Sequence, residues 1–176
     1  MTRIIAGEWR GHPLPKLKTG SVRPTTDRAR TILFDTLRDV REMHVLDLYS
    51  GTGALGFEAL SRGAVSLISI DQERKYINEQ KIWMMHRDKI FKAYVGDVQR
   101  VLRKLNQKFD LILADPPYAE KLSSNIIHLI EVHAAENAYF VYESARREES
   151  ILDSDVFKLL KEKVVAETKI QIYKAH

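Results

Sequence analysis

From residue 44 onward, short apolar runs alternate with longer amphipathic segments, and no other feature of the sequence restricts the fold more. Apolar runs of four to eight residues, about the length of a strand, are typical of buried strands. A strand–helix alternation predicts an α/β fold whose sheet is mostly parallel, with right-handed crossovers. The expected strands are 45–49, 66–70, 91–95, 109–114 and 139–143, and the expected helices are 54–62, 73–87, 98–106 and 122–134.

The sequence closes on two further β-prone runs, 157–165 and 168–174, with almost nothing between them. Such neighbours must pair antiparallel, as a hairpin. A mostly parallel sheet that ends in an antiparallel hairpin is typical of the class I (Rossmann-like) methyltransferase fold and not of nicotinamide-binding folds. Ahead of the first strand we expect a helix capped by Thr25 or Thr26. Its apolar face is formed by Ile32, Leu33, Phe34 and Leu37.

Composition excludes several classes of protein. A chain of 176 residues with 44% apolar content has room for one domain with a small appendage. The absence of cysteine excludes disulfides, thiolate zinc sites and cysteine nucleophiles. The six histidines have no metal-ligand spacing, so no metal is expected. No apolar run approaches the roughly 20 residues that cross a bilayer, and no signal peptide is seen, so we expect a cytoplasmic protein without membrane contact.

The positive charge is concentrated at the N-terminus. Residues 1–30 hold seven basic and two acidic groups, a charge of +5, which leaves −1 for the rest of the chain. We therefore expect a basic arm at 1–24 that faces phosphates, with a short β-hairpin near its start, joined to a catalytic domain at 25–176. The alternative is a solvated lead-in that touches nothing. The residues expected to bind nucleic acid are Arg3, Trp9, Arg10, Arg23 and Arg28, with Trp9 stacking on a base.

A glycine-rich turn follows the first predicted strand. The segment 47–56 has the Gly-x-Gly-x-x-Gly pattern that opens a helix and lets a ligand approach the backbone. Dehydrogenases place a pyrophosphate at such a turn. The carboxylate of Asp47 would repel a pyrophosphate, but it suits the ammonium and sulfonium of S-adenosylmethionine; otherwise it is a hydrogen-bonded turn acid. The turn residues expected to contact the cofactor are Asp47, Tyr49, Gly51, Gly53 and Gly56.

Two more acids stand where predicted strands end. Asp71, followed by Gln72, can accept both ribose hydroxyls of a nucleoside ligand, a role that suits either cofactor. Asp97 can accept a hydrogen bond from an adenine amine, with Val98 beside the ring. Aspartate is also a favoured N-cap, so helix capping is an alternative role for both acids.

The motif Asp115-Pro116-Pro117-Tyr118 ends the fourth predicted strand, where ligands of open α/β sheets bind. The two prolines fix a rigid turn. The lone pair of an exocyclic base amine is delocalised into the ring, so an enzyme must hold the amine with acceptors. The Asp115 carboxylate and the Pro116 carbonyl can each accept one amine hydrogen, and Tyr118 can stack on a base that has left its helix. The motif therefore predicts methylation of a base amine.

Taken together, these motifs resemble those of the RsmD family, bacterial methyltransferases that act on the N2 amine of a guanine in 16S ribosomal RNA. The segments 3–11 and 23–28 are similar to the family's two N-terminal motifs, and 46–64 is similar to its cofactor loop. Residues 115–118 match its Asp-Pro-Pro-Tyr/Phe motif, and Glu143 ends the fifth strand as in relatives. The loop departs from the family only at Tyr49, Ser50 and Thr52, where relatives more often have Phe, Ala and Ser.

The resemblance implies S-adenosylmethionine as methyl donor, S-adenosylhomocysteine as product and a guanine N2 amine as acceptor. The implied partner is 16S ribosomal RNA in a 30S subunit or an assembly intermediate, bound by a monomer. An enzyme acting on DNA adenine or cytosine is the nearest alternative, but reading a DNA sequence usually takes a recognition domain, for which the chain has no room. A nicotinamide oxidoreductase would leave Asp47 and Asp115 unexplained, and an inactive RNA-binding module would not need the motif.

Overall fold

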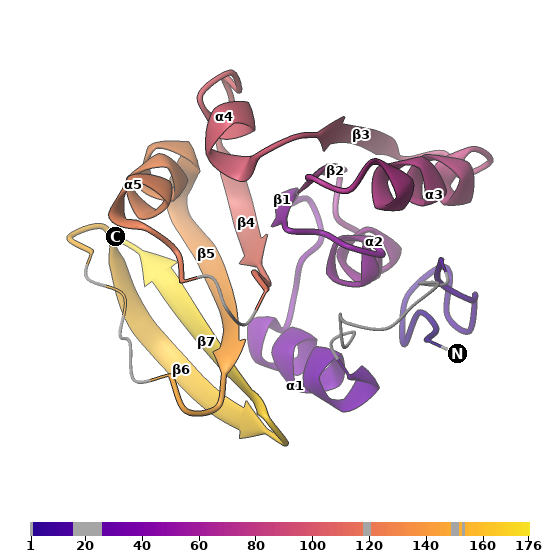
Figure 1. Ribbon diagram of the computed structural model, residues 1–176. Helices are drawn as coiled ribbons and strands as arrows, with labels where there is room; N and C mark the ends of the chain where they lie inside the picture. Colours follow the sequence, from indigo (N-terminus) through magenta and orange to yellow (C-terminus); the bar gives the residue numbers. More distant parts are fainter. Residues whose placement is uncertain (1, 16–25, 118–120, 149–151, 153) are drawn as a thin grey trace.

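The computed structural model describes residues 2–15, 26–117, 121–148, 152 and 154–176, in which one sheet carries helices on both faces (Figure 1). None of the helices in these ranges is long and apolar enough to cross a membrane. The helices are α1 (Asp27–Leu37), α2 (Ala54–Ser61), α3 (Arg74–Met84), α4 (Val98–Leu102) and α5 (Ser124–His133). The strands are β1 (His44–Leu48), β2 (Ser66–Asp71), β3 (Ile90–Val95), β4 (Phe109–Ala114), β5 (Ala134–Ala145), β6 (Phe157–Val165) and β7 (Thr168–Ala175).

The sheet has the strand order β3-β2-β1-β4-β5-β7-β6. The first five strands in this order are parallel, whereas β7 pairs antiparallel with both β5 and β6. The predicted class I methyltransferase fold and its closing hairpin are therefore confirmed.

Three predicted boundaries differ from the structure by three residues or more. α3 ends at Met84 and α4 ends at Leu102. After each helix the chain tightens into a 3-10 turn, in which a backbone N–H bonds to the carbonyl three residues earlier, as Met85 N does to Ile82 O and Lys104 N to Val101 O. β5 starts at Ala134, directly after α5, and a register shift follows its first pairing with β4.

Side chains that alternate along the strands fill two separate cores. Leu111 and Leu113 of β4 belong to the core that also contains residues of α1, α2 and α3. Ile112 and Ala114 point to the opposite face and pack with residues of α4 and α5. Thr26 caps α1 as expected: its side chain accepts a hydrogen bond from Ala29 N, and the helix buries Leu33, Phe34 and Leu37.

The start of the chain folds back on itself as a loop of residues 2–15, here called the arm loop. One isolated bridge joins Arg3 to Pro13, and Ile4 N donates to His12 O at 3.0 Å. Ile4, Trp9 and Leu14 are buried in the same core as α1 and α2. The arm loop is thus hairpin-like and packed on the domain, at the opposite end of the sheet from β6 and β7 (Figure 1).

Candidate active site

Three carboxylates meet at the carboxyl edge of the sheet. Asp47 lies in β1 opposite Leu113, Asp71 ends β2, and Asp115 follows β4 directly. Parallel strands end at one edge, which is where open α/β sheets bind ligands. Asp115 and Asp71 are near enough to Asp47 to raise its pKa electrostatically. Among the described residues, no three His, Asp or Glu side chains are arranged to hold a metal ion.

Hydrogen bonds hold the glycine turn against these acids. Gly51 N donates to Asp71 Oδ2 at 2.8 Å, and Gly56 N donates to Asp47 Oδ2 at 3.1 Å. Gly56 has no room for a side chain, because a Cβ there would lie 2.9 Å from that Asp47 oxygen and 2.7 Å from Leu67 Cδ1. A Cβ on Gly51 would meet only one backbone oxygen, at 4.0 Å. The turn is therefore tight against the domain and open beside Gly51.

Asp47 is 1% exposed. Burial, opposed by the hydrogen bond from Gly56 and assisted by the charges of Asp115 and Asp71, raises the pKa of Asp47 to about 8. A cation bound next to this carboxyl would stabilise its ionised form. The site is thus suited to a ligand that carries positive charge.

Asp71 joins the glycine turn to the start of α3. Its Oδ1 accepts from Glu73 N at 2.8 Å while its Oδ2 accepts from Gly51 N. Glu73, not Asp71, occupies the N-cap position of α3. Burial raises the pKa of Asp71 despite these two hydrogen bonds. A carboxylate has about four acceptor positions, so Asp71 can still accept from a ligand.

The remaining predicted cofactor residues differ in environment. Tyr49 is half-buried with a φ of 58°, and Gly53 precedes α2 with a φ of 78°. Gln72 is exposed and Val98 is buried in the second core. Asp97 caps α4, with its Oδ1 accepting from Arg100 N at 2.8 Å, so the alternative capping role occurs.

Gln80 supports the glycine turn and was missed by the sequence reasoning. It is fully buried, and its Nε2 donates to Ser50 Oγ and to Gly51 O, both at 2.9 Å. The sequence could have indicated this role, because Gln80 lies between Ile77 and Met84 on the apolar face of α3, and a buried polar side chain needs a hydrogen-bond partner.

The predicted catalytic motif continues from β4. Asp115 is half-buried, Pro116 is buried and Pro117 is exposed, while Tyr118 lies outside the described residues. Asp115 N donates to Leu48 O of β1 at 3.5 Å. Glu143, 2% exposed, lies in the neighbouring strand β5. Asp115 therefore stands between the glycine turn and β5, partly open to solvent.

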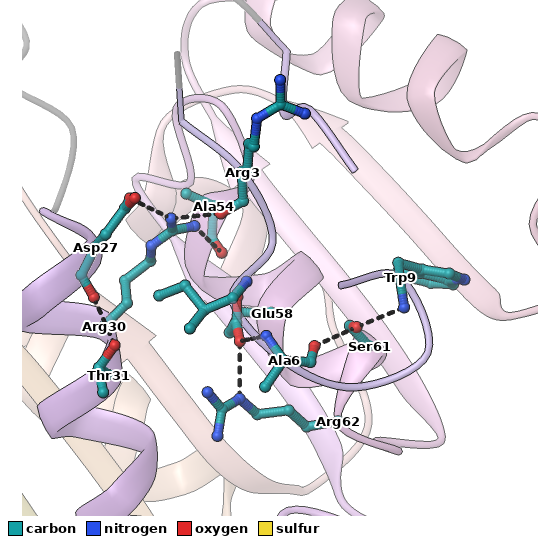
Figure 2. Close-up of polar contacts among 11 residues, drawn as sticks. Arg3, Ala6, Trp9, Asp27, Arg30, Thr31, Ala54, Glu58, Ser61 and Arg62 are labelled. Atoms are coloured by element: carbon teal, nitrogen blue, oxygen red, sulfur yellow. Dashed lines mark hydrogen bonds and ion pairs between the residues drawn. The ribbon is translucent and has the colours of Figure 1, made fainter. Parts of the chain in front are cut away.

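The arm loop is fixed to α2 by buried polar groups, as Figure 2 shows. The carboxylate of Glu58, 0% exposed, accepts from Ile5 N at 2.8 Å and from Ala6 N at 3.0 Å. Its Oε1 also pairs with Arg62 Nε at 2.8 Å. Ser61 Oγ donates to Ala6 O at 2.6 Å and accepts from Trp9 N at 3.0 Å. One face of the helix that follows the glycine turn is thus occupied by the arm loop.

Arg30 completes this attachment. It is fully buried, and its Nη2 donates to Arg3 O and to Asp27 Oδ1, both at 2.7 Å (Figure 2). Its Nη1 lies 3.5 Å from Ala54 O, in the first residue of α2. The sequence reasoning counted Arg30 only as basic charge, whereas the structure uses it to join the arm loop to α1 and α2.

The expectation that Trp9 stacks on a base conflicts with its position. Its side chain is 5% exposed, packed edge-on against Trp83 with ring centroids 5.4 Å apart. The guanidinium of Arg87 lies 5.4 Å from the Trp9 ring. A base cannot stack on a ring that the protein already covers, so Trp9 anchors the arm loop instead.

The predicted phosphate-binding arginines lie on the surface. Arg3, Arg10 and Arg28 are exposed, and Arg23 lies outside the described residues. Arg3 Nη1 donates to Gly11 O at 2.8 Å, within the arm loop. Arg28 lies near the start of α1, where Arg30 joins that helix to Ala54. Their contacts with nucleic acid remain predictions.

Known proteins resemble the chain over nearly its whole length. The family model described as Conserved hypothetical protein 95 matches residues 2–174. The protein named ribosomal RNA small subunit methyltransferase D of Escherichia coli K12 is 32% identical over 97% of this chain and 88% of its own length. Its namesake in Haemophilus influenzae is 29% identical over 97% and 92%.

Solved structures agree with these relatives. The putative methyltransferase yhhF from Escherichia coli is 28% identical and has a TM-score of 0.85, with 99% of this chain and 98% of that chain covered. A putative methyltransferase complexed with SAH, only 17% identical over 88% of this chain and 50% of that one, shares the fold with a TM-score of 0.70. The chain therefore belongs to the RsmD family of S-adenosylmethionine-dependent methyltransferases.

Proposed function

We propose that this protein transfers the methyl group of S-adenosylmethionine to the N2 amine of a guanine in 16S ribosomal RNA, within a small subunit or an assembly intermediate. The observation that carries the proposal is that Asp115 and Pro116 lie at the same sheet edge as Asp47 and Asp71. Ribosomal RNA as substrate is supported by the names of relatives that match 97% of the chain.

The cradle for the donor consists of the glycine turn and its acids. When bound, S-adenosylmethionine supplies a methyl group on a cationic sulfur. Burial disfavours the ionised form of Asp47 in the absence of a cation. A cationic ligand beside this carboxyl would favour the ionised form, so the site suits the methyl donor. The open side of Gly51 leaves space beside the turn, and Asp71 can accept from ribose hydroxyls. Asp97 keeps one carboxylate oxygen for the adenine amine.

Asp115 and Pro116 would hold the guanine amine. The carboxylate and the proline carbonyl each accept one N2 hydrogen, so the nitrogen lone pair is directed away from both acceptors. Positioning and charge stabilisation then supply most of the acceleration. The new N–C bond forms as the methyl group leaves sulfur, and the nitrogen loses one proton. Asp115 can accept it, since the side chain is half-buried and reaches solvent.

The test compares two aspartates at opposite ends of β4. Asp115→Ala should lower methylation of small-subunit RNA by about 100-fold or more, with little change in S-adenosylhomocysteine affinity. Asp110→Ala is the control, because Asp110 lies at the amino end of β4, where it accepts from His44 N at 2.8 Å. Nucleoside mass spectrometry would identify the product.

Three outcomes would reject the proposal. Normal turnover by Asp115→Ala would show that the amine is not held there. Methylated adenine or cytosine in a DNA substrate, with no guanine product in RNA, would favour the DNA alternative. A protein that binds S-adenosylhomocysteine but methylates no form of the small-subunit RNA would rule out this substrate.

A further inference from the structure

The turn that begins at Arg146, after β5, lies beyond the carboxyl edge of the sheet, next to the candidate active site. Ala114, the last residue of β4, pairs with Tyr142, and β5 then continues to Ala145. At about 3.3 Å per residue, β5 extends roughly 10 Å beyond the end of β4. Arg146 and Arg147 follow directly. Two adjacent arginines therefore lie beyond the carboxyl edge, on the β5 side of Asp115.

This turn is rigidly attached to the hairpin of β6 and β7. Arg146 N donates to Glu167 O and Glu148 N to Ala145 O, both at 2.9 Å. Lys169 Nζ donates to Glu148 O at 2.6 Å, and the Tyr142 hydroxyl donates to Glu148 Oε1 at 3.1 Å. These bonds use the backbone and the neighbouring side chains. Arg146 and Arg147 are exposed, and the ion pairs among the described residues include neither guanidinium.

Two lysines of β6 extend this basic surface. Lys161 pairs with Ile172 and Lys163 with Ile170 across the hairpin, so both lysines project on the sheet face that α1 and α2 cover farther along. Both are exposed. The acid between them, Glu162, alternates to the other face, where it accepts from Gln171 Nε2 at 2.9 Å. The strand thus separates the two lysines from Glu162.

A structural role explains only part of this pattern. Lysines on an edge strand prevent pairing with other chains, which would account for Lys161 and Lys163 in β6. That role does not account for Arg146 and Arg147, which lie in a turn whose backbone is already bonded to the hairpin. Four exposed cations on two connected segments are better suited to a polyanion.

We infer that Arg146, Arg147, Lys161 and Lys163 form a second phosphate-binding surface for the RNA substrate, here called the hairpin surface. It lies on the opposite side of Asp115 from the arm loop, since β5, β7 and β6 occupy the other end of the sheet (Figure 1). The inference rests on the proposed function. RNA whose guanine reached Asp115 would then have its backbone held on both sides of the flipped base.

The test is a salt titration of RNA binding for Arg146→Ala/Arg147→Ala and for Lys161→Ala/Lys163→Ala. Each pair should weaken binding about ten-fold at physiological salt and reduce the slope of log affinity against log salt by about 1.5. Arg103→Ala/Lys104→Ala is the matched control: it removes the same charge from exposed residues at the end of α4, away from the carboxyl edge, and should leave both quantities unchanged. S-adenosylhomocysteine affinity should be equal in all variants.

If the parent methylates RNA and both hairpin-surface pairs bind RNA like the parent, or no more weakly than the control pair, the hairpin surface is overturned while the proposed function stands. If the parent binds S-adenosylhomocysteine but neither binds nor methylates RNA, both are overturned. Two results together would support the proposed function and the hairpin surface. Asp115→Ala would bind RNA normally but not methylate it, and Arg146→Ala/Arg147→Ala would bind RNA more weakly, which assigns Asp115 to catalysis and the two arginines to binding.

Discussion

The two sides of the candidate site both carry many basic residues, but they are constructed in opposite ways. On the arm-loop side, Glu58 and Arg30 are fully buried and bonded to the backbone of residues 3–6. On the hairpin side, the backbone is fixed by strand pairing and by the turn, while Arg146 and Lys163 extend into solvent. The buried charges of the first side maintain the fold, whereas the cations of the second side are exposed.

The net charge of a segment therefore does not tell which of its groups can contact a partner. The amides of Ile5, Ala6 and Trp9 lose water when the arm loop packs on α2, so they need acceptors from the protein. Glu58 and Ser61 provide them. A strand of a sheet pairs its backbone without help from side chains, so the exposed lysines of β6 are not needed for that purpose.

Glu58→Ala is expected to have the largest effect, because it removes the acceptor of two amides and of the Arg62 guanidinium at a buried position. Breaking such a buried charged network costs about 3–5 kcal/mol in the free energy of unfolding. Urea denaturation measures that loss. Hydrogen exchange at Ile5 and Ala6 should become fast at the same time, because the arm loop opens before the rest of the domain.

The hairpin side supplies the control for this prediction. Lys161→Ala/Lys163→Ala should change the free energy of unfolding by less than about 0.5 kcal/mol, as is usual for exposed residues. A loss of that small size for Glu58→Ala would mean that apolar packing alone holds the arm loop. The two sides would then not differ in the way described.

The strands and the acids of the site could be predicted because their signals are local. The runs of β1, β2 and β4 are apolar and bounded by turn residues. Asp71 ends β2, Asp115 directly follows β4, and Asp47 is the residue before the last in β1. Any parallel arrangement of these strands brings the acids to one edge. By contrast, Ala134–Ala138 is not β-prone in composition, so the early start of β5 depends on pairing with β4.

The contacts of the arm loop could not be predicted, because their partners are distant in sequence. Trp9 looked like an exposed aromatic among charges, but its partner Trp83 lies in α3 and also stacks on Phe57, with centroids 4.4 Å apart. Glu58 and Arg62 have the i, i+4 spacing that on most helices belongs to a surface ion pair. Their burial follows from the placement of the arm loop on α2, which no local pattern encodes.

The next effect in size concerns Asp47, the buried acid that bonds to α2 through Gly56 N. Its pKa is raised from 3.8 to about 8, so between these values the folded, ligand-free protein holds a proton that the unfolded chain releases. The stability from this group is present at low pH and is lost as the pH rises toward about 8. Asp47→Asn should therefore stabilise the ligand-free protein near pH 8, with little effect near about pH 4.

Urea denaturation of parent and variant across this pH range measures the effect. Asp110→Asn, an exchange of the same kind at the amino end of β4, controls for the loss of one carboxylate elsewhere in the sheet. The affinity of the parent for S-adenosylhomocysteine should rise with pH up to about 8, because the ionised carboxyl attracts the ligand's ammonium, and Asp47→Asn should lose this rise. A variant with the parent's stability profile would show that Asp47 does not titrate in this range.

The smallest effect comes from two glycines of the arm loop that share a backbone conformation but not a surrounding. Gly7 has a φ of 85° and Gly11 a φ of 84°, so alanine is strained to a similar degree at both, by about 1 kcal/mol. A Cβ on Gly7 would lie 1.9 Å from Ser61 O, whereas a Cβ on Gly11 would have nothing within 4 Å. Gly7→Ala should therefore lose about 2 kcal/mol more unfolding free energy than Gly11→Ala, because the arm loop must move off α2 to make room. Urea denaturation of the two variants gives this difference directly, and the backbone strain cancels in the comparison. Equal losses of unfolding free energy in the two variants would mean that the arm loop shifts on α2 at no cost. The buried contacts of the arm loop would then contribute no more to stability than the exposed residues of the hairpin surface.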